Sequence, residues 1–336
     1  MAETVTFTID EAFQLALSAL TPSGTTEENA ESLIGGILGA ELDGISSHGF
    51  MYLPIYCEHV KCGKIDGKAS PSVREISPSA FLVDAKSGFA HPAIHAGFME
   101  MIPATKENGV CVLSVTNSYN CGVLGFHVSN LAEAGLLGLG FTNAPASIAP
   151  VGGSKPVIGT NPIACGVPDG DGGVKLIIDQ SSSVIARSEV TKHKNAGEPI
   201  PEGWALDPEG NPTTDPGVAL TGSMVPMGGY KGVGQGLIVE LLAAALSGAT
   251  LGIHASSFAT NDGGPCNTGQ FFLALNPDSF AGEAFFERLA ALSEAIDAQE
   301  GARLPGARRL AARKVIPDQG ITIPAALHER ILGYCA

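Results

Sequence analysis

Residues 43–54 place chemically active side chains directly after an apolar helical pattern. The segment reads Asp-Gly-Ile-Ser-Ser-His-Gly-Phe-Met-Tyr-Leu-Pro, so that Ser47 and His48 are adjacent between two glycines. Histidine exchanges protons near neutral pH, and glycine lets the backbone approach a ligand closely. The segment predicts a proton-transfer site, although a helix-terminal turn with a solvated histidine fits the same residues. A serine hydrolase is not indicated, because adjacent residues rarely point at each other and G-x-S-x-G is absent.

A second candidate is the glycine-rich segment 228–236, which reads Gly-Gly-Tyr-Lys-Gly-Val-Gly-Gln-Gly. It places Lys231 among glycines where a helix is expected to begin. Free backbone N–H groups and the helix dipole favour a phosphate there, while a flexible turn with a solvated lysine is the alternative. The usual dinucleotide motif G-x-G-x-x-G is missing after the first strand, and no Gly-Lys-Ser/Thr sequence makes a P-loop.

A basic run and a histidine pair complete the candidates. Residues 303–314 carry five basic side chains and no acid. Their guanidinium groups suit a nucleotide phosphate, and a helix face paired with the protein's own carboxylates fits equally. His91 and His95 have metal-ligand spacing, but the glutamate of H-E-x-x-H is missing and Pro92 stands at the expected helix start. We therefore expect no metal site.

Composition narrows the classes of partner. The 336 residues have a formal net charge of −15, which argues against nucleic acids and anionic membrane surfaces as partners. Hydrophobic residues make up 44% of the chain, enough to bury a sizeable core. The seven cysteines include no C-x-x-C pair, which favours free thiols in a reducing cytoplasm. Neither a signal peptide nor an apolar run of membrane-spanning length is recognised.

Strands and helices alternate irregularly along the chain. Strands are expected at 5–9, 73–76, 81–84, 110–116, 136–142, 174–179 and 270–275. Helices are expected at 10–20 with Asp10 as cap, from a Thr25/Glu28 capping box to about 43, and at 92–106, 126–134, 232–246, 285–298 and 324–332. Residues 143–170 are expected to form a long ordered and functional loop, and 197–216 a lid or boundary. Without a regular βαβ period, a simple doubly wound domain is not expected.

Six motifs in order resemble the type 2 malate/L-lactate dehydrogenase family of NAD(P)H-dependent oxidoreductases over nearly the whole length. They are Ser46–Gly49 followed by Leu53-Pro54, Asn117-Ser118, Gly159–Ala164, Asp179 with Ser183, Gly228–Gly232 and Arg303–Gly306. The resemblance implies a mixed α/β, non-Rossmann fold and a homodimer. It implies a helical domain from 1–70 and 300–336, an α/β domain from 71–118 and 232–299, and a cofactor-binding and substrate-loop region at 119–231.

The resemblance also implies roles for individual residues. His48 is the implied proton donor, Ser47 stands beside it in a relay, and Glu189 is the third member where close relatives carry aspartate. Thr160 is implied to contact the substrate carboxylate, with Tyr52 nearby. The residues implied to line the cofactor are Tyr119, Asn120, Cys121, Gly122, Val123, Asp179, Gln180, Ser181, Arg187, Ser188, Tyr230, Lys231, Arg303, Leu304, Pro305, Gly306, Ala307, Arg308 and Arg309.

Three departures from the family pattern bear on specificity. Tyr52 stands where the family usually has an arginine that pairs with the substrate carboxylate, and tyrosine supplies one hydrogen bond but no charge. This disfavours small dicarboxylates such as malate. Asn120-Cys121 replaces the usual His-Phe. Ala307 replaces a common glutamate beside Arg308 and Arg309, which favours the additional 2′-phosphate of NADP.

Within the family the chain is most similar to the Δ1-piperideine-2-carboxylate/Δ1-pyrroline-2-carboxylate reductases. The runs Pro201–Pro216 and Gly229–Gly232 support this similarity. We therefore expect NADPH, with NADH as the alternative, to reduce Δ1-pyrroline-2-carboxylate to L-proline, and the six-membered analogue to L-pipecolate. A 2-oxo acid dehydrogenase of the malate/lactate type and a catalytically altered dinucleotide-binding protein are the other hypotheses.

Overall fold

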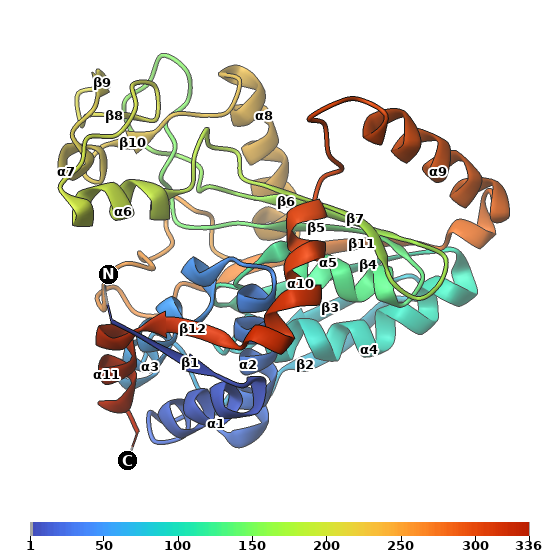
Figure 1. Cartoon of the computed structure of the whole chain (residues 1–336), viewed down its shortest axis with the longest axis horizontal. Coiled ribbons are helices and arrows are strands. Elements are labelled where there is room, and N and C mark those ends of the chain that lie inside the picture. Colours follow the sequence, from blue (N-terminus) through green and yellow to red (C-terminus); the bar gives the residue numbers. More distant parts are fainter. Residues whose placement is uncertain (1–2, 336) are drawn as a thin grey trace.

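A seven-stranded mixed sheet lies at the centre of the computed structural model, which describes residues 3–335 (Figure 1). Its strand order is β2-β3-β4-β11-β5-β6-β7, and only the β3–β4 pair is parallel. The strands are β2 (Ser72–Ser77), β3 (Ala80–Asp84), β4 (Val110–Ser118), β5 (Leu137–Thr142), β6 (Ile163–Pro168), β7 (Val174–Gln180) and β11 (Thr268–Leu275). The antiparallel pairing confirms that the sheet is not of the doubly wound parallel type.

Helices cover both faces of this sheet. On one face α4 (Ala90–Asn108) and α5 (Leu124–Glu133) bury an apolar core that includes Phe272. On the other face α8 (Tyr230–Val239) continues into a π-helical segment, η3 (Glu240–Ala245), which packs on Phe271. Neighbouring residues of β11 thus serve opposite cores, because successive side chains of a strand alternate between faces.

The two ends of the chain meet in a helical layer below the sheet (Figure 1). β1 (Thr4–Phe7) pairs antiparallel with β12 (Ile321–Pro324), and one core joins residues from both ends. The helices of this layer are α1 (Ile9–Leu20), α2 (Glu27–Leu42), α3 (Leu53–Lys61), α10 (Ala307–Gln319) and α11 (Ala325–Leu332). The division of the chain into a helical domain from both termini and two further regions stays a prediction.

Residues 181–229 form a smaller unit, seen beyond the end of the main sheet in Figure 1, and its core also contains Ile148 and Ile158 from the connection between β5 and β6. It contains α6 (Arg187–Ala196), β8 (Ala205–Leu206), β9 (Pro212–Thr213), α7 (Pro216–Ala219) and β10 (Ser223–Met224), with strand order β10-β8-β9. Elsewhere η4 (Pro277–Ser279) leads to α9 (Glu283–Asp297), which projects from the body and buries only Ser293.

Several local expectations were wrong in detail. The cap of α1 is Thr8 and not Asp10. The Thr8 hydroxyl accepts a hydrogen bond from Glu11 N, and the Glu11 carboxylate accepts one from Thr8 N. The cap of α2 is Thr26 and not Thr25. Residues 143–170 were expected to be loop but contain β6, whose pairing with β5 and β7 outweighs its glycine and proline content. Among residues 3–335, no helix is both long and apolar enough to cross a membrane.

Candidate active site

Ser47 and His48 lie in a short 3₁₀ turn, η1 (Ser46–His48), directly after α2. Ser47 Oγ lies 3.1 Å from His48 Nδ1, and both side chains are half-buried. The expectation that these adjacent side chains do not face each other was therefore wrong. A second 3₁₀ turn, η2 (Phe50–Tyr52), follows at once and carries Tyr52. The contact leaves Nε2 as the ring atom that can exchange a proton with a ligand.

Glu41, in the last turn of α2, holds the backbone that follows His48. Its Oε1 accepts a hydrogen bond of 2.7 Å from Phe50 N, and a Cβ at Gly49 would lie only 2.1 Å from the same oxygen. Burial raises the pKa of Glu41, and the hydrogen bond from Phe50 opposes this only in part. Sequence reasoning missed this residue, although an acid among the apolar positions of α2 was the signal.

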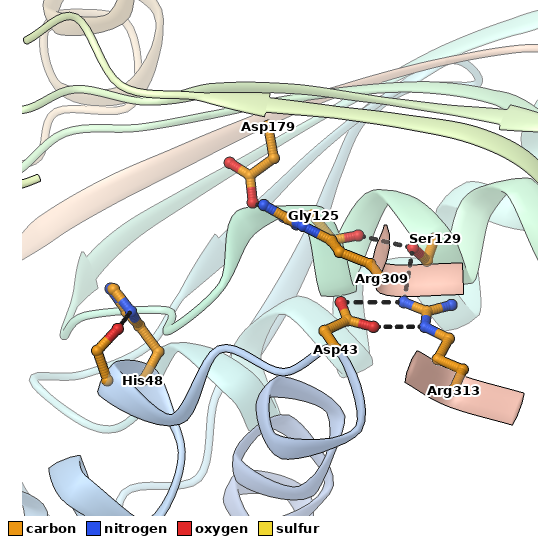
Figure 2. A network of polar contacts seen from close by, with 8 residues as sticks. Asp43, His48, Gly125, Ser129, Asp179, Arg309 and Arg313 are labelled. Atoms are coloured by element: carbon orange, nitrogen blue, oxygen red, sulfur yellow. Dashed lines mark hydrogen bonds and ion pairs between the residues drawn. The ribbon is translucent and has the colours of Figure 1, made fainter. Parts of the chain in front are cut away.

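The charged side chains of Asp179 and Arg309 act in opposite directions on the pKa of His48 (Figure 2). Burial lowers the pKa of His48, the negative charge of Asp179 raises it, and the positive charge of Arg309 lowers it. Asp179 stands on β7 and Arg309 on α10. The net direction is downward, so the neutral imidazole is favoured.

The carboxylate of Asp179 caps the N-terminus of α5 (Figure 2). Its Oδ2 accepts from Gly125 N at 3.0 Å and from Arg309 Nη1 at 2.9 Å. A helix N-terminus attracts anions through its free N–H groups and its dipole. The structure thus brings two predicted cofactor segments, the end of β7 and the start of α10, together with the start of α5, which directly follows the predicted loop 119–123.

The Arg303–Gly306 turn lies against the edge of β7, directly beside Asp179. Ile177 N donates to Pro305 O at 3.3 Å. Gly306 has a φ of +82°, and a Cβ there would lie 2.8 Å from Ile177 N, so the close approach requires glycine. The motif is positioned by an additional backbone contact at a sheet edge, which its sequence does not reveal.

Some arginines of the basic run 303–314 pair with the protein's own carboxylates, and others are free to bind a phosphate. Arg309 pairs with Asp179, and Arg313 pairs with Asp43 at 2.5 Å. By contrast Arg303 and Arg308 are exposed, and neither forms an ion pair with any residue from 3 to 335. Two exposed guanidinium groups beside a helix N-terminus fit a dinucleotide phosphate.

Tyr52 joins the predicted cofactor loop through Asn120. Asn120 Nδ2 donates to the Tyr52 hydroxyl at 3.4 Å, and its Oδ1 accepts from Gly122 N at 2.7 Å. Burial raises the pKa of Tyr52 to about 12, so the phenol stays neutral at physiological pH. Behind it the Tyr119 hydroxyl lies 2.5 Å from His59 Nδ1, a partner that sequence reasoning missed. The lining at this point is polar and uncharged.

The other predicted residues of the cofactor loop and of β7 have mainly structural contacts. Burial raises the pKa of the Cys121 thiol to about 12, so it is not a reactive thiolate. Cys121 O accepts from His127 Nε2 at 2.8 Å, and Ser181 Oγ lies 2.9 Å from Ser183 Oγ. Val123 is buried, whereas Gln180 is exposed.

Thr160 lies in the connection between β6 and the preceding strand and is half-buried. Its carbonyl accepts a hydrogen bond of 2.7 Å from Ser182 N, which fixes the backbone next to the end of β7. The predicted contact of Thr160 with a substrate carboxylate remains a prediction.

The remaining predicted residues lie on the 181–229 unit and the start of α8. Arg187 Nη2 donates to Leu220 O at 2.7 Å, and Ser188 follows it in α6. Glu189 pairs with Lys192 at 3.8 Å, and within residues 3–335 no hydrogen bond or ion pair joins Glu189 to His48. The three-residue relay therefore remains a prediction. At the start of α8, Tyr230 and Lys231 are exposed, as a ligand-binding role requires.

The two histidines of α4 differ in burial, since His91 is buried and His95 is exposed. The His91 ring centroid lies 5.3 Å from that of His127, and burial lowers the pKa of His91. The part of the chain that the structure describes contains no cluster of three or more His, Cys, Asp or Glu side chains suited to a metal ion.

Comparison with known proteins identifies the family. The model of the malate/L-lactate dehydrogenase family matches residues 7–332. The chain is 43% identical to (2R)-3-sulfolactate dehydrogenase (NADP(+)) of Chromohalobacter salexigens, over 96% of each chain. It is 38% identical to Δ1-pyrroline-2-carboxylate reductase of Ancylobacter novellus, over 97% of this chain and 96% of the relative.

A solved structure gives the same result for the fold. The crystal structure of Δ1-piperideine-2-carboxylate reductase from Pseudomonas syringae matches with a TM-score of 0.92 and 32% identity, covering 98% of this chain and 99% of that one. These relatives are oxidoreductases, and the sheet seen here is their non-Rossmann fold. The chain therefore belongs to the malate/L-lactate dehydrogenase family and is an NAD(P)-dependent oxidoreductase.

Proposed function

We propose that this protein reduces a cyclic imino acid, converting Δ1-pyrroline-2-carboxylate to L-proline and the six-membered analogue to L-pipecolate. The observation that carries the proposal is the neutral, half-buried Tyr52, four residues along the chain from His48, whose hydroxyl accepts a hydrogen bond from Asn120. Such a lining suits a substrate with a single carboxylate, because a second anion would be desolvated without a cation there. The relative from Ancylobacter novellus, at 38% identity, supports the same substrate class.

His48 is the proton donor in this proposal. The nicotinamide ring, when bound, supplies a hydride to C2 of the substrate. His48 Nε2 gives a proton to the imine nitrogen, so the C=N bond becomes a C–N single bond with both electrons accounted for. Ser47 holds Nδ1, and Glu189 completes the relay when it reaches the ring. Thr160 and Tyr52 hold the carboxylate.

The proposed cofactor is NADPH. The exposed guanidinium groups of Arg303 and Arg308 suit its 2′-phosphate, and Ala307 adds no competing acid between them. The other residues proposed to hold it are Tyr119–Val123, Asp179–Ser181, Arg187, Ser188, Tyr230, Lys231, Leu304–Gly306 and Arg309. All seven cysteines are free, which supports a reducing cytoplasm as the location.

A homodimer is proposed as well. An apolar face on α8 and η3 is solvent-exposed, and its large residues are Leu237, Ile238, Leu241 and Leu246, from 48% to 64% exposed. Glu240 is the only charged residue between 232 and 253, and its side chain is buried. A second copy suits this face, since two chains of net charge −15 repel each other elsewhere and meet here without like charges.

A second substrate is favoured by one specific observation, the 43% identity to a (2R)-3-sulfolactate dehydrogenase. The corresponding oxo acid carries a sulfonate in addition to its carboxylate, so it needs a second anion site. Exposed Arg303 or Arg308 are the unpaired cations that a sulfonate could share with the cofactor.

The test is the loss of reduced-nicotinamide absorbance with NADPH or NADH and with Δ1-pyrroline-2-carboxylate, sulfopyruvate, pyruvate or oxaloacetate. Turnover of the imine alone supports the reductase, whereas turnover of oxo acids alone rejects it. His48→Asn is expected to abolish turnover and keep NADPH binding, measured by fluorescence titration. His95→Asn, on an exposed face of α4, is the matched control and should change neither.

A further inference from the structure

Glu240 is a buried carboxylate to which the proposed function assigns no role. It is 7% exposed and is the first residue of the π-helical segment η3. The π geometry is seen in the bond from Leu246 N to Leu241 O, which spans five residues. Such segments are uncommon and are concentrated at functional sites.

The Glu240 carboxylate receives N–H donors from separate parts of the chain. Its Oε1 accepts from Asn161 Nδ2 at 2.9 Å, and its Oε2 accepts from Gly252 N at 3.1 Å. Asn143 Nδ2 lies 3.5 Å from Oε2. No cation within residues 3–335 forms an ion pair with it. Both oxygens are thus used as acceptors, which a glutamine cannot reproduce because one of its two terminal atoms is a donor.

Asn161, the residue after Thr160, donates the shortest of these hydrogen bonds to the Glu240 carboxylate. It is fully buried and has a φ of +37°, a backbone conformation that is strained for a residue other than glycine. Its Nδ2 also donates to Gly236 O at 3.0 Å, and its Oδ1 accepts from Ala144 N at 3.1 Å. The side chain therefore joins α8 to both ends of the connection between β5 and β6.

The backbone around Thr160 is held on its other side by Ser182. Ser182 N donates to Thr160 O at 2.7 Å, and Ser182 Oγ donates to Asn161 O at 2.9 Å. A Cβ at Gly159 would lie 2.3 Å from Ala144 O, so the turn packs too closely on Ala144 for any residue other than glycine at this position. An unpaired buried carboxylate, a left-handed asparagine and a π-helical turn all converge on the segment that presents Thr160. A fold retains such costly features where the geometry they fix is used.

We propose that Glu240 is a positioning residue, which acts through Asn161 to hold Thr160 in place for the carboxylate of the substrate. The proposal rests on the proposed function for the role of Thr160. It extends that function to a residue that touches neither substrate nor cofactor. It also explains why the apolar helix at 232–246 carries a single acid, since that acid faces the substrate loop rather than solvent.

The experiment compares Glu240→Gln and Asn161→Asp with the wild type. Glu240→Gln replaces one carboxylate oxygen by an NH2 group, which then faces the N–H donors of its neighbours. Asn161→Asp places a second carboxylate against that of Glu240. Both substitutions leave the side-chain volume nearly unchanged. We expect the substrate KM to rise about tenfold, which is the order lost with one orienting hydrogen bond. The NADPH dissociation constant should change less than about twofold.

Ser247→Ala is the matched control. Ser247 is buried just beyond the same π-helical segment, and its hydroxyl donates to Ala243 O at 2.6 Å, so its hydrogen bonds stay at this end of the helix. This variant removes a buried hydrogen bond at the same helix and should leave the substrate KM unchanged. A parallel rise of substrate KM in the control, or an unchanged KM in both test variants, overturns the proposal.

Hydrogen–deuterium exchange separates this proposal from the proposed function, because it needs no substrate. Glu240→Gln should speed exchange in peptides covering 143–162 and leave those of β7 unchanged; equal exchange in the loop overturns the proposal. If Glu240→Gln does not fold, Asn161→Asp is measured alone with the same two outcomes. Should the wild type reduce none of the substrates, the proposed function fails while the exchange result still decides whether Glu240 fixes the loop.

Discussion

At the scale of single residues, the chemistry centres on an imidazole whose charge is set by its surroundings. Burial and Arg309 favour neutral His48, whereas Asp179 favours the imidazolium. A proton donor must be protonated before it reacts, so these charges decide the pH range in which reduction is fast.

The first prediction concerns the pH dependence of reduction. The pKa of His48 lies below its usual 6.5, so kcat/KM for reduction should be highest below that pKa and fall as pH rises through it, with a midpoint under 6.5. Asp179→Asn removes the charge that raises the pKa and should move the midpoint to lower pH. Asp171→Asn, at an exposed turn, should leave it unmoved. A wild-type midpoint at or above 6.5 contradicts the prediction.

The second prediction concerns Tyr52. Tyr52→Arg places a cation where the phenol now accepts from Asn120, so it should favour substrates with two anionic groups. We expect kcat/KM for oxaloacetate or sulfopyruvate, relative to the cyclic imine, to rise at least about tenfold. Tyr52→Phe removes the hydroxyl without adding charge. It should lower kcat/KM for the cyclic imine and should not raise kcat/KM for oxaloacetate or sulfopyruvate. An unchanged ratio in Tyr52→Arg would place the carboxylate elsewhere.

At the scale of elements, α10 connects three parts of the molecule (Figure 2). Arg313 reaches Asp43 at the end of α2 and donates to Ser129 Oγ of α5 at 3.2 Å, while Arg309 reaches Asp179 on β7. The loop that carries His48 begins just after Asp43. The helix therefore fixes the end of α2 relative to the sheet.

The third prediction tests this connection by stability. Arg313→Ala leaves the fully buried Asp43 side chain without its partner, and breaking a buried pair costs about 3–5 kcal/mol. Arg330→Ala removes the exposed pair with Glu58, which is worth about 0–1 kcal/mol. The melting temperature should thus fall much further in Arg313→Ala, as measured by differential scanning fluorimetry. Equal shifts in the two variants would mean that the Asp43 pair adds little.

At the scale of the whole molecule, the charge of −15 and the uncharged face of α8 and η3 are the features on which the proposed homodimer rests. The fourth prediction is that the wild type has about twice the 34.3 kDa chain mass in light scattering. Leu241→Glu, at a position 62% exposed, should give the single-chain mass. Leu332→Glu, 48% exposed on α11, is the control and should remain dimeric. A wild type of single-chain mass refutes the dimer.

Secondary structure was largely predictable, and the exceptions have physical causes. The periodic segments 30–38 and 92–106 gave α2 and α4 because one face of each must be buried. Helix α6 and strand β8 were missed, since Val190 and Ala205 are buried in the small core of the 181–229 unit, and β9 was missed because it forms by pairing with β8. The six motifs and the family were recognisable because they are local in sequence.

The sequence by itself determined the family, the type of chemistry and the candidates Ser47, His48 and Tyr52, because these depend on residue identity and short spacing. Only the tertiary structure decided which partners act on them. Three such partners come from other elements. Glu41 holds the turn that follows His48, His59 contacts Tyr119, and Glu240 accepts a hydrogen bond from the residue after Thr160. No local sequence pattern records these contacts. The division of the basic run into paired and exposed arginines was likewise decided in three dimensions. It depends on which carboxylates the fold brings within reach, and a charge count cannot contain that information.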